Sequence, residues 1–257
     1  RLTTAHSDLN TYLYSTATKP EKRVRVDFRH HTNLETIDEP MRGDISGMRV
    51  EGQHLWLVSD ETWSLERLTA DADGGYAEHR SYDLSTIFDL PDDNEIDLEA
   101  LAVRDGWVWL VGSHALKRKK PRPEKDDAEK TIKRLKRIER EANRYFLACV
   151  PLEESSEGPE PVAQSSDGRR AACVRMKKGT NDLAKALAKD PHVGWSLQVP
   201  AKENGLDIEG IAVNGDRVFL GLRGPVLRGM AVMIELSVGN KGDGRLKLRK
   251  AFGDKRR

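Results

Sequence analysis

The stretch that decides the fold is Asp97-Leu-Glu-Ala-Leu-Ala-Val-Arg-Asp-Gly-Trp-Val-Trp-Leu-Val111, because the chain contains its pattern three times. The same pattern begins at Asp44 and again at Asp207, and the three copies align without a gap. In each copy an apolar residue directly follows the Asp. A small residue stands three places after the Asp, a Val six places after it and an aromatic residue twelve places after it. Such self-similarity predicts that the three segments are equivalent units of a repeat fold.

Each copy predicts a β-hairpin. A short apolar strand leads to a turn that contains Gly52, Asp105-Gly106 or Asn214-Gly215, and these residues tolerate the positive φ of tight hairpin turns. A strand rich in β-branched and aromatic residues follows each turn. Further strands are predicted at residues 64–68, 76–80, 144–150, 231–236 and 246–250.

The spacing of the copies favours a propeller. Asp44 and Asp97 are 53 residues apart, and Asp207 follows 110 residues after Asp97. A four-stranded unit of about 40–50 residues is the size of a propeller blade. A plain antiparallel sandwich would not return the same Asp pattern each time. We therefore expect one all-β, β-propeller-like domain over residues 1–257, built of repeated four-stranded antiparallel blades. Its repeated aromatic residues should be buried at equivalent places between blades: Trp56, Trp109 and Phe219.

A basic insertion interrupts the repeat at residues 114–143. Residues 117–144 hold thirteen Lys and Arg and six Asp and Glu, a net charge of +7. Because the whole chain carries +1, the remainder carries −6. A helix is predicted over 127–143, outside the sheets, with one apolar stripe that should face the body: Ile132, Leu135 and Ile138.

Two further segments lie between the second and third copies. Residues 153–170 are rich in Ser, Pro, Glu and Gly and predict a flexible loop. Residues 181–189 predict a short helix that ends before Asp190-Pro191.

Composition and motifs exclude several classes of protein. No apolar run approaches the roughly 18 residues of a membrane-spanning helix, so we expect no membrane partner. Cys149 and Cys173 are the only cysteines, which argues against a disulfide framework and favours a reducing, cytoplasmic compartment. The sequence contains no Walker loop, G-x-G-x-x-G, H-E-x-x-H or C-x-x-C motif. The basic run 117–122 lacks the interleaved aromatic residues of a single-strand binder, so we do not expect nucleic acid as a partner.

An acid pair opens two of the repeats. Its residues stand two apart on a strand and should share a face, and in a propeller they would converge at the central channel. Converging oxygen ligands suit a hard divalent cation such as calcium. The alternative is that each Asp accepts hydrogen bonds from the backbone N–H groups of an adjacent loop and locks one blade to the next. We prefer this alternative for the Asp residues, while both uses stay open for the Glu residues. The candidate metal ligands are Glu99, Glu209, Asp97 and Asp207.

The ends of the second strands predict a shared rim. Sixteen and seventeen places after each repeat Asp stand Asp60-Glu61, Ser113-His114 and Arg223-Gly224. An acid, an imidazole and a guanidinium at equivalent positions indicate a rim where each unit offers different chemistry, although surface salt bridges would also explain them. His114 has the only side chain of this set that titrates near neutral pH. The candidate ligand-binding residues are Asp60, Glu61, Ser113, His114 and Arg223, and the last two are the candidate catalytic residues.

Several motifs together resemble a known family. They are Asp97-Leu-Glu-Ala, Gly112-Ser-His114, Asn143-Arg-Tyr145 and Asp207-Ile-Glu-Gly followed by Gly221-Leu-Arg-Gly-Pro225. Over about residues 27–252 the chain is similar to the bacterial family called domain of unknown function 3616. The resemblance implies a β-propeller-like fold, distantly similar to esterase-like phytases, without an established activity. Members of this family continue with more strands, so we expect the last blade to be incomplete at Arg257.

Two functions follow as expectations. The first is a binding or scaffold module whose channel or rim holds a small anionic ligand or a protein partner, and the lack of a complete catalytic motif favours it. The alternative is a metal-assisted hydrolase of phosphate or carboxylic esters. In that case Glu99 and Glu209 would hold the cation, and His114 or Arg223 would face the substrate.

Overall fold

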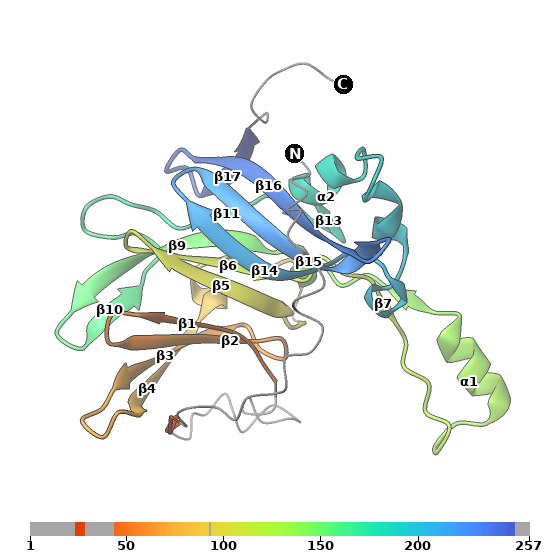
Figure 1. Cartoon of the computed structure of the whole chain (residues 1–257), viewed down its shortest axis with the longest axis horizontal. Helices are drawn as coiled ribbons and strands as arrows, with labels where there is room; N and C mark the ends of the chain where they lie inside the picture. Colours follow the sequence, from red (N-terminus) through yellow and green to blue (C-terminus); the bar gives the residue numbers. More distant parts are fainter. Residues whose placement is uncertain (1–23, 29–43, 93, 250–257) are drawn as a thin grey trace.

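The first repeat forms a sheet of its own. The computed structural model describes residues 24–28, 44–92 and 94–249 (Figure 1). They are mainly β, as predicted. Four antiparallel strands follow one another in the order β1-β2-β3-β4. Their bounds are β1 (Ile45–Glu51), β2 (His54–Ser59), β3 (Ser64–Ala70) and β4 (Tyr76–Asp83).

The other two repeats share one large sheet with the strand order β14-β15-β16-β17-β11-β9-β6-β5, and β10 pairs with β9. Its two end strands, β14 and β5, lie side by side, so the eight-stranded path nearly closes into a barrel (Figure 1). The bounds are β5 (Leu98–Arg104), β6 (Trp107–Gly112), β9 (Leu147–Ser155), β10 (Gly158–Pro161), β11 (Ala172–Val174), β14 (Asp207–Asn214), β15 (Arg217–Leu227), β16 (Met230–Asn240) and β17 (Arg245–Arg249).

Separate four-stranded blades are therefore not seen for the second and third repeats in the described residues. The reason is β11, which pairs antiparallel with β9 and parallel with β17. This short strand joins the two repeats into one continuous sheet, a link that the repeat pattern does not encode.

The three predicted hairpins are present and share one register. In each, the small residue lies opposite the residue fourteen places after the repeat Asp: Gly47 opposite Val58, Ala100 opposite Val111 and Gly210 opposite Gly221. The register shifts just before this pair in every hairpin, which leaves one residue of the first strand as a β-bulge. A bulge bends the strand and redirects the extra side chain. The bulged residues are Ser46, Glu99 and Glu209.

Backbone crowding explains the small residue of the first repeat, whereas a Cβ at Gly210 would meet its nearest neighbour at an ordinary 3.6 Å. A Cβ at Gly47 would lie 3.0 Å from the Cα of Ala100, because β1 packs directly against β5. In the second hairpin Asp105 and Gly106 both have positive φ, at 53° and 71°, as expected for a two-residue hairpin turn.

The repeated aromatic residues are not equivalent. Trp56 is 1% exposed and packs near Tyr82 in the core between the two sheets. Trp109 and Phe219 are only partly buried. The expectation of matching burial is wrong for these two. The guanidinium of Arg217 lies over the ring of Phe219, 5.0 Å from the ring centre.

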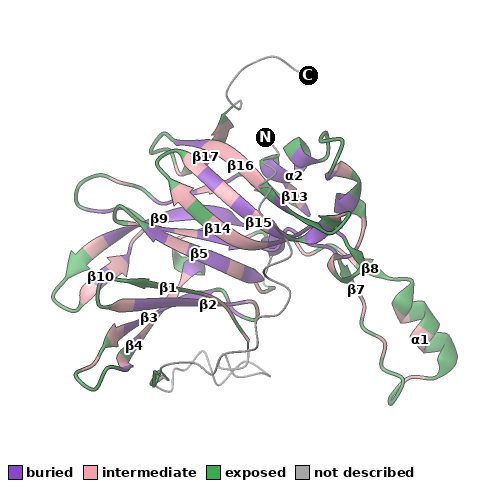
Figure 2. Ribbon diagram, in the orientation of Figure 1, coloured by how far each residue is buried: buried purple, intermediate pink, exposed green. Residues whose placement is uncertain are grey.

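The basic insertion forms an arm rather than a helix packed on the body. Two short strands, β7 (Lys117–Arg118) and β8 (Ile138–Glu139), pair as a ribbon, and α1 (Ala128–Leu135) extends from it, away from the sheets (Figure 1). The helix lies outside the sheets as predicted, but it is shorter than 127–143. The expectation that its apolar stripe faces the body is wrong (Figure 2), because the ribbon holds the helix away from any covering surface. The exposed fractions are 54% for Ile132, 40% for Leu135 and 44% for Ile138.

The segment 153–170 is not simply a loop, because it contains the end of β9 and all of β10. The short helix predicted near residue 181 is α2 (Asp182–Leu187), with Asn181 as its N-cap. It follows a small hairpin of β12 (Met176–Lys177) and β13 (Thr180–Asn181). Among the described residues, four 3₁₀ turns complete the elements: η3 (Leu84–Thr86), η4 (Asn143–Tyr145), η5 (Gly194–Gln198) and η6 (Ala201–Glu203). Within the described ranges, none of the helices has the length and apolar character needed to cross a bilayer.

Candidate metal centre

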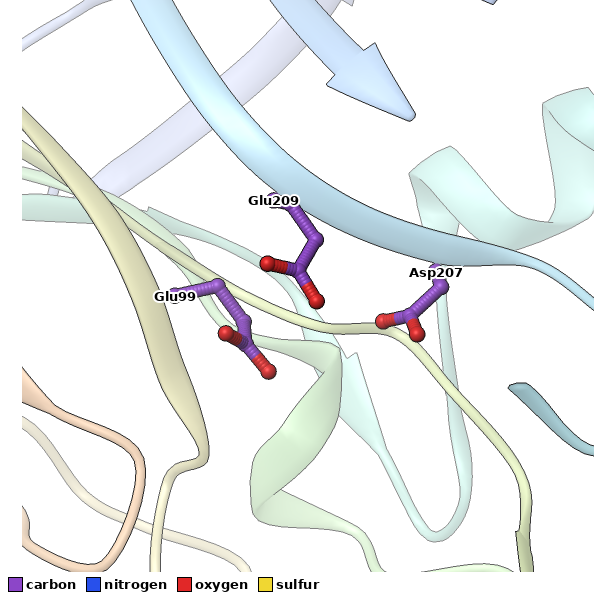
Figure 3. A group of neighbouring side chains, drawn as sticks. All are labelled: Glu99, Asp207 and Glu209. Carbon is purple, nitrogen blue, oxygen red and sulfur yellow. The ribbon is translucent and has the colours of Figure 1, made fainter. Parts of the chain in front are cut away.

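Three of the four predicted metal ligands meet between β5 and β14. Glu99 comes from β5, and Asp207 and Glu209 come from β14, and their carboxylates point toward one another (Figure 3). Each residue offers one oxygen, and these oxygens all lie within 4.8 Å of one another. We call Glu99, Asp207 and Glu209 the acid cluster. Both glutamates occupy the bulge of their hairpin, so the shared bulge is what presents them at this place.

The spacing of the acid cluster fits one cation. Ca²⁺ binds oxygen ligands at about 2.3–2.6 Å, so two ligands of one ion can stand up to about 5 Å apart. The three oxygens satisfy that limit. All the donors are hard oxygens, which suits calcium or a similar ion rather than a metal that prefers sulfur.

Burial and mutual repulsion disfavour the charged form of two of these acids. Burial, together with the negative charges of Asp97, Glu209 and Asp207, raises the pKa of Glu99 to about 8. Burial also raises the pKa of Asp207 to about 6, although the charge of Arg223 opposes the change. A bound cation would favour the ionised form of these groups and would displace their protons.

Arg223 is the cation already present at the cluster. Its guanidinium pairs with Asp207 and, at 2.7 Å between Nη1 and Oε1, with Glu209. The Arg223 side chain is 54% exposed, whereas Asp207 is buried. One guanidinium faces three carboxylates, so the cluster keeps an excess of negative charge whenever its acids are ionised.

Asp97, the fourth predicted ligand, has a different partner. Its Oδ2 accepts a hydrogen bond from Nη1 of Arg144 at 2.5 Å, and both side chains are 9% exposed. The same guanidinium also pairs with Glu95 at 3.2 Å and with Glu141. Asp97 is therefore held in a buried ion-pair network and does not belong to the acid cluster. Asp97 is thus held by an arginine side chain, and not by the backbone N–H groups that the preferred locking role assigns to the repeat Asp.

The predicted rim is only partly formed. Asp60 is half-buried, and its Oδ1 is buried with no hydrogen-bond partner in the described part of the chain. Burial raises the pKa of Asp60, and the charges of Asp44 and Glu209 act in the same direction. Asp60 therefore lies within electrostatic reach of the acid cluster. Glu61 is exposed as a whole residue. Partial desolvation of its carboxyl raises its pKa, and the negative charge of Asp60 acts in the same direction.

His114 and Ser113 are not on an open rim, and this expectation is wrong. His114 is 2% exposed and Ser113 is 1% exposed. Nδ1 of His114 donates to the carbonyl of Gly112 at 2.9 Å, and Nε2 accepts from the amide of Asn181 at 2.8 Å. Burial lowers the pKa of His114 to about 4. The imidazole is neutral at physiological pH and is held by the fold, so it is not placed to act as an acid or base for a substrate.

Two residues of this region were missed in the sequence. Arg144 stands 47 residues from Asp97, and only the fold brings them together. Asn181 binds His114, donates to the carbonyl of Tyr145 at 2.7 Å and caps α2. Its position before a short helix predicts the cap, but no sequence signal points to the contact with His114.

Comparison with known proteins adds one match. No curated protein and no solved structure matches the chain. The model of a family described as "Protein of unknown function (DUF3616)" matches residues 44–257, which include all three repeats and the acid cluster. The chain belongs to the DUF3616 family.

Proposed function

We propose that the chain is a β-propeller-like binding module whose acid cluster holds one hard divalent cation, of the calcium type. The observation that carries the proposal is the meeting of Glu99 with Asp207 and Glu209, from two different repeats, with one oxygen of each within 4.8 Å of the others. Glu99 and Glu209 stand at the same bulge of two hairpins. Each therefore supplies a carboxylate from one side of the site.

The shared hairpin geometry supports the propeller-like arrangement. The first strands of the repeats, β1, β5 and β14, pack beside one another in that order, as the innermost strands of propeller blades do around an axis. The bulged side chain reaches the neighbouring repeat in each case that can be compared. The hydroxyl of Ser46 donates to the carbonyl of Leu98 on β5, and Glu209 on β14 approaches Glu99.

The local charge supports a cation as the ligand. Besides the acid cluster, Asp60 lies within electrostatic reach and has a buried oxygen without a hydrogen-bond partner among the described residues. Arg144 is already committed to Asp97, Glu95 and Glu141. Arg223 alone cannot balance the remaining carboxylates, and buried carboxylates without compensation are costly.

The site supports binding better than ester hydrolysis. A metal-assisted hydrolase needs a group that moves a proton near the substrate. His114, the candidate for that task, is buried and bonded through both ring nitrogens. Arg223 could orient an anion beside the cation but does not exchange protons near neutral pH.

Calcium titration by isothermal calorimetry tests the proposal. We expect one calcium ion per chain for the parent protein and a loss of affinity of at least tenfold for Glu209→Gln. Glu235→Gln is the matched control, because Glu235 also pairs with an arginine, Arg217, at 2.8 Å and is similarly exposed. This control should bind like the parent. The proposal is contradicted if calcium produces no binding heat with the parent protein and does not raise its melting temperature.

A further inference from the structure

A second candidate site uses none of the acid-cluster residues. A cavity of about 640 Å³ lies where the chain after β4, at residues 89–92, passes β11, β12 and the start of β17. Pockets that hold small molecules are commonly about 300–1,000 Å³, so this cavity is large enough for one. Its lining comes from four separate segments of the chain, and β11 and β17 belong to the large sheet.

Four cationic side chains line the cavity: Arg175, Lys177, Lys178 and Arg245. None of them forms an ion pair with an acid in the part of the chain that the structure describes. This differs from the basic arm, where Arg118 pairs with Glu203 and Arg134 with Asp126. A concentration of unpaired cations in one concave place attracts an anion.

The acids at the cavity do not neutralise these cations. Asp89 and Asp92 contribute to the lining. The carboxylate of Asp92 accepts hydrogen bonds from the backbone N–H groups of Asn94 at 3.0 Å and Ala142 at 3.2 Å. Asp92 therefore serves to hold the wall of the cavity, and four cations against two carboxylates leave an excess of positive charge.

Part of the wall is apolar and fixed. Leu90, Cys173 and Met176 line the cavity, and all three pack against the core between the two sheets. An apolar wall next to unpaired cations matches a ligand that has a hydrocarbon body and an anionic head. Lysine and arginine donate charge-assisted hydrogen bonds to phosphate oxygens.

We propose that this cavity binds a small organic anion that carries a phosphate-like dianionic head on an apolar body. The head would lie among Arg175, Lys177, Lys178 and Arg245, and the body would lie against Leu90 and Met176. The ligand would be bound without a chemical step, and the site would act independently of the acid cluster.

Calorimetry with three probes tests the match between head and body. Hexyl phosphate combines both parts, inorganic phosphate has only the head, and hexanol has only the body. We expect hexyl phosphate to bind at least tenfold more tightly than phosphate, and hexanol to give no measurable binding. Equal binding of hexyl phosphate and phosphate, or no binding of either, would overturn the proposal.

Variants then locate the probe. Arg245→Gln and Lys177→Gln should each weaken hexyl phosphate binding by at least fivefold. Lys202→Gln removes the same charge from an exposed lysine that is not part of the lining and should leave the binding unchanged. If the control weakens binding as much as the two lining variants, the attraction is a general charge effect and the proposal fails.

Cys173 offers a direct readout in the unmodified protein. Its thiol lines the cavity and is partly exposed, whereas Cys149 is buried. Saturating hexyl phosphate should slow alkylation of Cys173 by N-ethylmaleimide severalfold, as measured by mass spectrometry, while hexanol should not. An unchanged rate at Cys173 with the probe bound would show that the probe lies elsewhere. Calcium binding at the acid cluster is not involved, so either proposal can fail without the other.

Discussion

Asp97 and Asp207 occupy the same position of two repeats, yet their arginine partners give them different roles. Asp97 pairs with Arg144, and both side chains are 9% exposed. Asp207 pairs with Arg223, whose side chain is 54% exposed. Arg144 comes from η4, beyond the basic arm, whereas Arg223 comes from β15 of the same hairpin as Asp207.

The difference shows how one repeat position can serve two purposes. A buried guanidinium that bonds three acids locks the second repeat to the segment after the arm. In the proposed site, a half-exposed guanidinium would leave Asp207 and Glu209 able to exchange it for another cation. The structural ion pair and the proposed binding site are therefore two outcomes of the same acid position, and the accessibility of the arginine decides between them.

Removal of Arg144 should have the largest effect. Arg144→Met leaves the buried Asp97 carboxylate without its partner, and breaking a buried pair commonly costs about 3–5 kcal/mol. Urea unfolding at neutral pH should show a loss of this size. Arg223→Met should lose less, about 1 kcal/mol, because the guanidinium is half-exposed and solvent screens its pair with the buried Asp207. Equal losses for the two variants would remove the distinction between lock and site.

The second prediction concerns the pH dependence of the cation-free protein. The pKa of Glu99 is about 8 in the folded chain, against 4.5 as its ordinary value. The folded state therefore holds a proton that the unfolded chain releases between these pH values. In EDTA, this difference should lower the free energy of unfolding by about 2 kcal/mol from pH 5 to pH 8. The lowered pKa of His114 acts in the opposite direction below about pH 6.5, so the contribution of Glu99 is measured as the difference between the parent and a variant that lacks its carboxyl.

Glu99→Gln should remove most of this fall, because glutamine does not titrate. Urea unfolding of the parent and the variant at pH 5, 6, 7 and 8 measures the effect. A parent protein and a Glu99→Gln variant whose stabilities change equally between pH 5 and pH 8 would contradict the assigned environment of Glu99.

Arg223→Gln should separate stability from binding. If Arg223 competes with the cation for Asp207 and Glu209, its removal should raise calcium affinity about three- to tenfold, with little change in unfolding free energy. Calorimetric titration of the variant and the parent measures the change. Weaker calcium binding in the variant would mean that Arg223 supports the bound state instead of competing with it.

The smallest effect is expected at the first repeat, which has Ser46 where the other two have glutamate. Ser46 donates to a backbone carbonyl of β5 and supplies no carboxylate. Ser46→Ala should cost about 0.5–1.5 kcal/mol, the usual contribution of one hydrogen bond, and should leave calcium affinity as it is. A change in calcium affinity would place Ser46 within the site.

The sequence predicted the hairpins well because their signals are local. The repeated Asp, the small residue and the turn glycines lie within one short stretch, and the matching register shows that they determine the same hairpin each time. The two glutamates could be proposed as partners for the same reason, since equivalent positions of neighbouring repeats approach one another.

Contacts between distant segments could not be read in this way. The strand β11 joins two repeats through three residues, and three residues carry too little pattern to predict parallel pairing with β17. The partner of Asp97 stands 47 residues away. The stripe of Ile132 and Leu135 has helical spacing, but the spacing says nothing about whether a surface lies opposite it. His114 was misassigned because burial, rather than residue type, decides whether a histidine is available for chemistry.

A crystal structure of the calcium-loaded protein tests the central claim most directly. We expect one ion between β5 and β14, with oxygens of Glu99, Asp207 and Glu209 at about 2.3–2.6 Å, and Arg223 displaced from at least one carboxylate. Crystals grown in saturating calcium that show no ion there, with Arg223 still paired to Asp207 and Glu209, would contradict it.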